Sequence, residues 1–188
     1  MRTRHPRRWT TCLVIAATVG ATAGCGGGTG ETAATTGGRA AGKPAAPTEA
    51  ERAAERSALA AYTGYLDASR TASRESDPRH PGLARFLADP LLTRVRVAID
   101  QARRHGAMRT GTLRSAPTVT AVSLDTVPQT VEIQDCLDAT GYRLVYVKDR
   151  RVVPGSGGSR YLATATATRY PDGRWLINSG AAHEDQPC

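Results

Sequence analysis

The sequence lacks the short motifs that mark several common enzyme classes. It contains no P-loop, no GxGxxG dinucleotide fingerprint, no HExxH zinc motif and no GxSxG nucleophile elbow. The glycine-rich segment Gly155-Ser156-Gly157-Gly158 joins two expected strands, which favours a hairpin loop over a phosphate-binding loop that opens a helix. The motifs therefore point to no nucleotide-dependent enzyme, zinc protease or α/β-hydrolase.

Lysine and aromatic residues are scarce. Lys43 and Lys148 are the only lysines, and aromatic residues make up 5% of the chain. Nucleic-acid-binding proteins usually combine a basic face with interleaved aromatic residues, whereas the arginines here are scattered. Four of them lie in residues 1–24 and account for half of the formal net charge of +8. We expect no nucleic-acid partner.

The chain also lacks a long apolar run, because the one near its start, Cys12–Ala23, is shorter than the roughly 20 residues that span a bilayer. An arginine-rich start followed by a short apolar run is typical of a signal peptide. The next residues, Thr22-Ala23-Gly24-Cys25, are similar to a lipobox, although Thr22 stands where leucine is usual. The sequence therefore predicts a signal peptide over 1–24 and a lipid on Cys25 that holds the protein to the outer face of the cell membrane. The alternative is cleavage after Ala23 at an A-x-A site, which gives a secreted protein with a free Cys25 thiol.

Residues 25–47 are rich in Gly, Ala, Thr and Pro and contain no large apolar side chain. Such a segment buries too little apolar surface to offset its ordering entropy, so we expect a flexible tether. Residues 48–188 have the length of one domain with a single core.

Cysteine is rare, with four in the chain. Cys12 leaves with the signal peptide and Cys25 is assigned to the lipid, which leaves Cys136 and Cys188 as a pair. In an oxidising compartment we expect a disulfide, which closes a loop of about 50 residues and stabilises the fold by roughly 4 kcal/mol. Two buried thiols or a metal site are the alternatives, but no Cys or His stands at zinc-like spacing around Cys136. We expect no metal and no cofactor.

The first part of the domain has helical patterns. Thr48 and Glu51 form a capping-box pattern, which begins a helix that runs to about Arg74. A short helix is expected over 82–87, and a third begins after Asp89-Pro90 and ends before Gly106.

After Gly106 the pattern alternates, as in strands. The predicted strands are Met108–Leu113, Thr118–Leu124, Thr130–Leu137, Tyr142–Val147, Tyr161–Tyr170 and Arg174–Asn178, with an irregular tail over Gly180–Cys188. The order predicts an α+β fold in which two or three N-terminal helices pack on a strongly bent, cone-like antiparallel sheet of five or six strands.

Several strings resemble the nuclear transport factor 2-like (SnoaL-like) superfamily, in particular actinobacterial secreted lipoproteins that carry such a domain. They are the stripe of Tyr62, Tyr65 and Leu66, the strand Val131–Asp138, and Arg174-Trp175-Leu176-Ile177 after a Pro-Asp-Gly turn, with a cysteine at 188. The resemblance covers Thr48 to Cys188 and implies a bent sheet around a pocket that helices close. Some members are isomerases or dehydratases and many are non-catalytic, so the fold does not determine the function.

Asp135 is the best acidic candidate for chemistry, since it follows Val131 and Ile133 on the inward face of its strand. In a pocket it is a candidate general base, with Tyr62 or Tyr142 as the partner that supplies a phenol. The interpretation that we prefer is structural: Asp135 and Asp138 sit at a strand end and cap the turn over 139–141.

The sequence thus favours a lipid-anchored, extracytoplasmic, non-catalytic module that binds a small apolar ligand or an envelope protein. The first alternative is an isomerase- or dehydratase-type enzyme that uses Asp135 with a tyrosine. The second is a structural accessory of a membrane complex, which an exposed apolar patch would favour.

Overall fold

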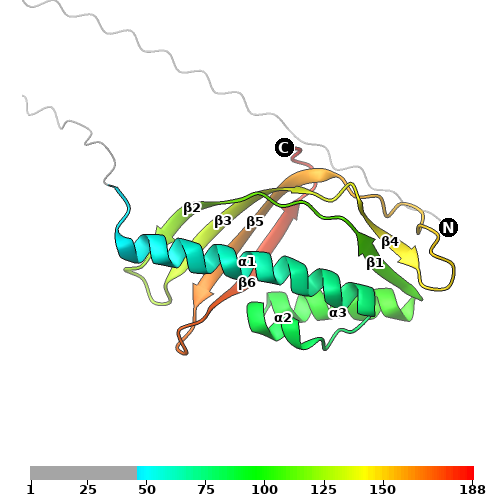
Figure 1. Cartoon of the computed structure of the whole chain (residues 1–188), viewed down its shortest axis with the longest axis horizontal. Helices are drawn as coiled ribbons and strands as arrows, with labels where there is room; N and C mark the ends of the chain where they lie inside the picture. Colours follow the sequence, from blue (N-terminus) through cyan, green and yellow to red (C-terminus); the bar gives the residue numbers. More distant parts are fainter. Residues whose placement is uncertain (1–45) are drawn as a thin grey trace, which may run out of the picture. The chain divides into compact units, whose positions relative to one another are not determined.

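The computed structural model describes residues 46–188, so the predicted signal peptide and Cys25 lie outside the described residues. Within these residues three helices precede six strands, which confirms the predicted α+β class. Figure 1 shows the long first helix, α1 (Glu49–Glu75), running beneath the strands, with the two shorter helices beside it. No helix within residues 46–188 is long and apolar enough to cross a membrane.

Local sequence signals set the ends of the helices. The Thr48 hydroxyl accepts from the Glu51 N–H at 3.2 Å, and the Glu51 carboxylate accepts from the Thr48 N–H at 2.6 Å, which is the predicted capping box. The second helix, α2, is Pro81–Phe86, and the third, α3, is Leu91–Arg104. The N-cap of α3 is Pro90, one residue later than the predicted Asp89, and it has no side-chain cap bond; a carboxylate oxygen of Asp89, just before the cap, accepts from the Thr93 N–H at 3.1 Å.

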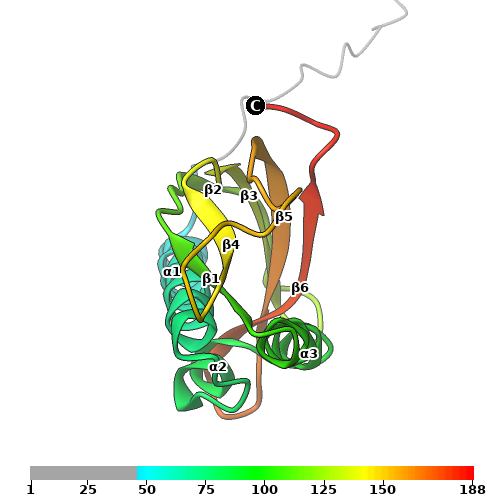
Figure 2. The ribbon, with the colours of Figure 1, turned by 90° about the vertical axis from the view of Figure 1, so that its right-hand side faces the viewer.

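The strands form two antiparallel sheets instead of the single bent sheet that we predicted. The strands are β1 (Ala107–Gly111), β2 (Pro117–Ser123), β3 (Thr130–Asp138), β4 (Tyr142–Tyr146), β5 (Arg160–Arg169) and β6 (Trp175–His183). A four-stranded sheet has the order β2-β3-β5-β6, and β1 pairs with β4 in a separate two-stranded sheet. Figure 2 shows β1 and β4 beside α1, with α3 seen nearly end-on. The chain between β1 and β2 bonds to the end of β3 through Arg114 and Asp138, so the two sheets meet there.

The pairing of two strands with their neighbours is irregular. The register of β2 against β3 shifts between Val119 and Ala121, and Thr120 at the shift is exposed. The last strand is longer than predicted, because β6 stays paired with β5 as far as His183 after a second register shift.

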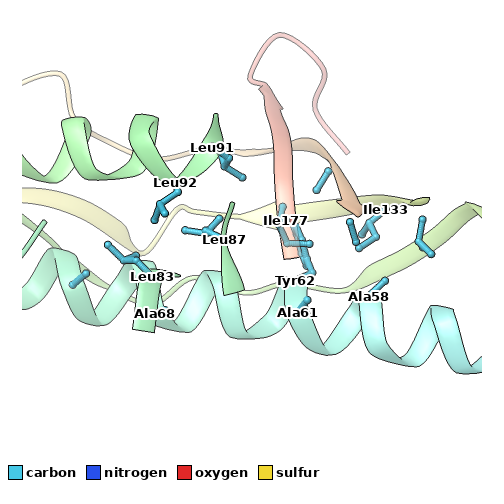
Figure 3. Packing of buried hydrophobic residues seen from close by; sticks show 14 of the residues in the cluster. Ala58, Ala61, Tyr62, Ala68, Leu83, Leu87, Leu91, Leu92, Ile133 and Ile177 are labelled. Atoms are coloured by element: carbon cyan, nitrogen blue, oxygen red, sulfur yellow. The ribbon is translucent and has the colours of Figure 1, made fainter. Parts of the chain in front are cut away.

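The core lies between α1 and the four-stranded sheet. One face of α1 is built mostly of buried alanines around Tyr62, and β5 presents Ala163, Ala165 and Ala167 inward. Small side chains on both elements let the helix approach the sheet closely. Figure 3 shows Tyr62 beside Ile133 and Ile177, with Leu83, Leu87, Leu91 and Leu92 continuing the core towards α2 and α3.

Candidate functional site

Asp135 is buried, with 1% of its surface exposed, and its carboxyl group receives three hydrogen bonds. The Tyr62 hydroxyl donates at 3.1 Å, the Ser115 hydroxyl at 2.6 Å and the Ala116 N–H at 2.7 Å. Alternation along β3 puts Asp135 on the same face as Val131 and Ile133, as its sequence position predicts. The carboxyl group therefore ties α1 and the segment before β2 to the middle of the sheet.

The preferred interpretation of Asp135 as a turn cap is wrong, and that of Asp138 is right. Asp138 accepts from the Thr140 N–H at 3.0 Å and from the Thr140 hydroxyl at 2.6 Å. These bonds hold the pKa of the Asp138 carboxyl group below its usual range. The two aspartates differ because residues three apart on a strand face opposite sides, so one points to the core and the other to the turn.

The paired tyrosine is Tyr62 and not Tyr142. Burial and then the neighbouring charge of Asp135 raise the pKa of the Tyr62 hydroxyl far above its usual value. Neither Asp135 nor Tyr62 lines any of the three cavities described below. A general base must reach a substrate proton, and three donors already surround this carboxyl group. The pair is a structural tie in this geometry.

Two neighbouring cavities, both lined by Tyr65, lie where the two-stranded sheet meets the helices. The first, the loop cavity, has a volume of about 400 Å³ and is bounded by α1, β1, the start of β4 and β5, and the loop Gly155–Ser159. The second, the helix cavity, has about 230 Å³ and lies between α1 and α3. Both are lined by Tyr65, Ser69, Arg109 and Tyr142. These four residues form the shared wall of a two-part pocket, the kind of concave site in which ligands bind.

Local geometry explains how the shared wall is built. In the register of β1 with β4, Arg109 lies opposite Leu144, and Gly111 lies opposite Tyr142, so Arg109 and Tyr142 are diagonal neighbours on one face. The Arg109 guanidinium lies 5.9 Å from the centre of the Tyr142 ring, within cation–π range. The Tyr65 ring packs edge to face on the Tyr62 ring, with ring centres 5.9 Å apart. The orientation of Tyr65 therefore depends on Tyr62, whose hydroxyl is bound to Asp135.

Charged groups of both signs border the loop cavity, including Arg109 and Glu184. Burial raises the pKa of the Tyr161 hydroxyl, the charge of Glu184 raises it further, and the charge of Arg109 opposes the rise. Both charged groups are therefore close enough to Tyr161 to act on it. Burial likewise raises the pKa of the Tyr65 hydroxyl. A ligand here would meet a positive group, a negative group and phenols that keep their protons at neutral pH.

A larger groove of about 780 Å³ runs between the α1–α2 turn and α3, but its chemistry is less suited to a ligand. Its arginines include Arg103 and Arg104, and each lies 2.6 Å from a carboxylate oxygen of Asp100. No aromatic side chain lines it. The groove is a charged helix surface in which Asp100 pairs with Arg103 and Arg104, whereas the buried Nε atom of Arg96 has no hydrogen-bond partner among residues 46–188. Within the same residues, no group of three His, Cys, Asp or Glu side chains is placed to hold a metal.

Cys136 and Cys188 form a disulfide with Cα atoms 5.8 Å apart, which is the pairing expected from the cysteine count. The bond fixes the segment after β6, and that segment carries Glu184 to the loop cavity. Structural disulfides are typical of oxidising compartments outside the cytoplasm. The location is therefore extracytoplasmic.

Sequence comparison adds no family, since no known protein family and no curated protein matches the chain. Among solved structures, the chain is similar to the intermembrane space region of the chloroplast protein ARC6, with 18% identity and a TM-score of 0.42. The alignment covers 72% of this chain and 98% of that chain. Function therefore has to be argued from the site itself.

Sequence reasoning found part of the pocket wall and missed the rest. It named Tyr142, but as a partner for Asp135, and it placed Tyr65 in the core stripe of the first helix. It gave Arg109 no role. The strand pattern could have shown that Arg109 and Gly111 share one face of β1. Whether that face borders a cavity depends on how the two-stranded sheet packs on the helices, and the local pattern does not determine that packing.

Proposed function

We propose that this protein is an extracytoplasmic, non-catalytic binding module that holds a small ligand in the two-part pocket lined by Tyr65, Ser69, Arg109 and Tyr142. The observation that carries the proposal is that two cavities with a common wall lie between the helices and the two-stranded sheet. The loop cavity is lined largely by polar and charged groups and the helix cavity mainly by apolar ones, and concave sites that combine apolar walls with orienting polar groups are typical of small-molecule binding. A helix-closed pocket against bent strands is also what the resemblance to the nuclear transport factor 2-like superfamily implies, and we propose that relationship.

We further propose that a lipid on Cys25 holds the module to the membrane. The lipobox-like string supports this assignment, and the disulfide, which needs an oxidising compartment, is consistent with export. Cys25→Ala should move the protein from the membrane fraction to the soluble fraction, and Cys12→Ala is the matched control that should not. Unchanged membrane association of Cys25→Ala would show that the lipid assignment is wrong.

Native mass spectrometry of the protein extracted from its own membranes tests the pocket directly. We expect a mass above that of the protein with its lipid, and we expect gentle activation to remove the excess. Ala102→Leu, which fills the helix cavity, should reduce the ligand-bound fraction, whereas Val97→Leu on the exposed side of the same helix should not. A clean mass for the unaltered protein would favour an envelope-protein partner over a small ligand.

The two other hypotheses from the sequence gain less support. An isomerase or dehydratase would need Asp135 to face a substrate, and the carboxyl group is instead enclosed by Tyr62, Ser115 and Ala116. A structural accessory would show a large apolar patch. The large apolar residues that are exposed within 46–188 are four valines distributed over α3, the β2–β3 turn and the segment after β4.

A further inference from the structure

Resting on the proposed function, we propose that the ligand is an amphipathic organic anion, with its acidic group at Arg109 and its apolar part in the helix cavity between α1 and α3. The inference depends on how polar and apolar groups are distributed along the pocket. It names a class of ligand and not a compound, since the walls define charge and shape only.

The helix cavity supplies the apolar part of the site. Its α3 wall consists of Val95, Ala98, Ile99 and Ala102, at the three- and four-residue spacing of one helix face. Apolar area leaving water contributes about 25 cal/mol per Å², so a short hydrocarbon chain gains affinity by entering this space. A wholly polar ligand would leave the α3 wall without a matching surface.

Arg109 supplies the charge at the boundary between the two cavities. Among residues 46–188 its guanidinium forms no ion pair and no hydrogen bond, and its contact is with the Tyr142 ring. Arg70 is the other cation at the loop cavity, and its guanidinium lies 3.2 Å from a carboxylate oxygen of Asp67. Arg70 does not line the helix cavity. Arginine binds carboxylates and phosphates through paired N–H donors, so a free guanidinium beside an apolar cavity suits an anionic head group.

Ser69 gives a second, independent indication. Its hydroxyl oxygen is buried, lacks a hydrogen-bond partner among the described residues, and belongs to a residue that lines both cavities. A buried hydroxyl without a partner costs stability, and such a group in a native structure calls for an explanation. An acceptor atom of the ligand beside Arg109 would satisfy this donor.

Glu184 provides a test of the sign of the ligand's charge. It lines the loop cavity but not the helix cavity, so it opposes an anion from one side and would attract an amine. If the ligand is an anion at Arg109, removing the charge of Glu184 should strengthen binding. If the ligand is a cation, the same change should weaken it.

The experiment is calorimetric titration of the full chain in lipid nanodiscs with octanoate, octanol and octylammonium, with empty nanodiscs as the blank. We expect octanoate to bind at least about tenfold more tightly than the other two, since charge-assisted bonds exceed neutral ones by this order. Arg109→Gln should remove that preference, whereas Arg143→Gln on the neighbouring strand, outside both cavities, should keep it. Glu184→Gln should tighten octanoate binding severalfold, and Ala102→Leu should weaken all three probes.

Each other outcome overturns the inference in a recognisable way. Equal binding of octanoate and octanol, or an Arg109→Gln variant that binds octanoate normally, overturns the anion assignment and leaves the pocket function standing. Preferred octylammonium binding that Glu184→Gln abolishes reverses the sign of the ligand. If no probe binds although native mass spectrometry shows a ligand, the amphipathic class is wrong, and if neither shows binding, the proposed function fails as well.

Discussion

The contact between Tyr62 and Asp135 predicts the cost of removing a single buried hydrogen bond. Tyr62→Phe keeps the ring, which is 2% exposed and packs in the core, and deletes only the hydroxyl that donates to Asp135 at 3.1 Å. Hydrogen bonds to charged groups contribute about 1.5–3 kcal/mol, and this one is long for its type, so we expect a loss of about 1.5 kcal/mol in the free energy of unfolding. The carboxyl group keeps the shorter bonds from Ser115 and Ala116.

Asp135→Asn should cost more, because the amide group that replaces one oxygen cannot accept a hydrogen bond. With its amide oxygen on the Ala116 N–H, the asparagine places its NH2 group at the Tyr62 and Ser115 hydroxyls, which must rotate to accept and then lose the carboxylate as the acceptor for their own protons, so we expect a loss of about 3 kcal/mol. The two changes share one contact, and the double variant should therefore lose less than the sum, by about 1 kcal/mol. Urea unfolding of the oxidised protein followed by circular dichroism measures all three values.

The result that would refute this reasoning is an Asp135→Asn variant that is as stable as the unaltered protein or more stable. A buried group that destabilises its own fold is the signature of a site kept for activity. That outcome would return the enzyme hypothesis, with Asp135 and Tyr62 as its candidate residues. Strict additivity of the two changes would show that the hydrogen bond contributes nothing.

Three further predictions concern the disulfide, alkaline pH and one glycine. Reducing the Cys136–Cys188 bond should lower the free energy of unfolding by about 4 kcal/mol, and an unchanged urea midpoint with reductant would argue against the bond. The buried hydroxyl of Tyr62 has a raised pKa, so its stabilising effect is complete below about pH 10 and is lost as the pH rises further; Tyr62→Phe should reduce that loss in unfolding titrations between about pH 9 and 11, and the raised pKa values of Tyr65 and Tyr161 account for the part that remains. A methyl group on Gly64 would collide with the Phe86 ring, so Gly64→Ala should destabilise by about 1 kcal/mol in spite of its better helix propensity, and Phe86→Leu should remove the penalty; a stabilised Gly64→Ala would contradict the packing.

Much of the fold could be predicted because its signals are local. The Thr48 capping box and the alternation along Tyr161–Tyr170 both involve residues within a few positions of one another. These patterns determine the elements and their inward faces before any long-range contact is considered.

The division into two sheets and the character of the site could not be predicted in this way. The separation of β1 and β4 from the other strands depends on pairing across the chain. Asp135 was assigned to the inward face but judged to be a cap, because the donors that surround it come from distant positions at Tyr62, Ser115 and Ala116. Local patterns show which way a side chain points and not what it meets.

The adjacent positions 135 and 136 of β3 have a consequence for how the strand finds its partners. Asp135 faces α1 and Cys136 faces the opposite side, where it bonds Cys188. A slip of β3 by one residue would turn the carboxyl group outward and the thiol inward, so the cysteine could no longer reach its partner. The disulfide is therefore compatible with the register in which Asp135 faces α1, and it disfavours a β3 strand displaced by one residue.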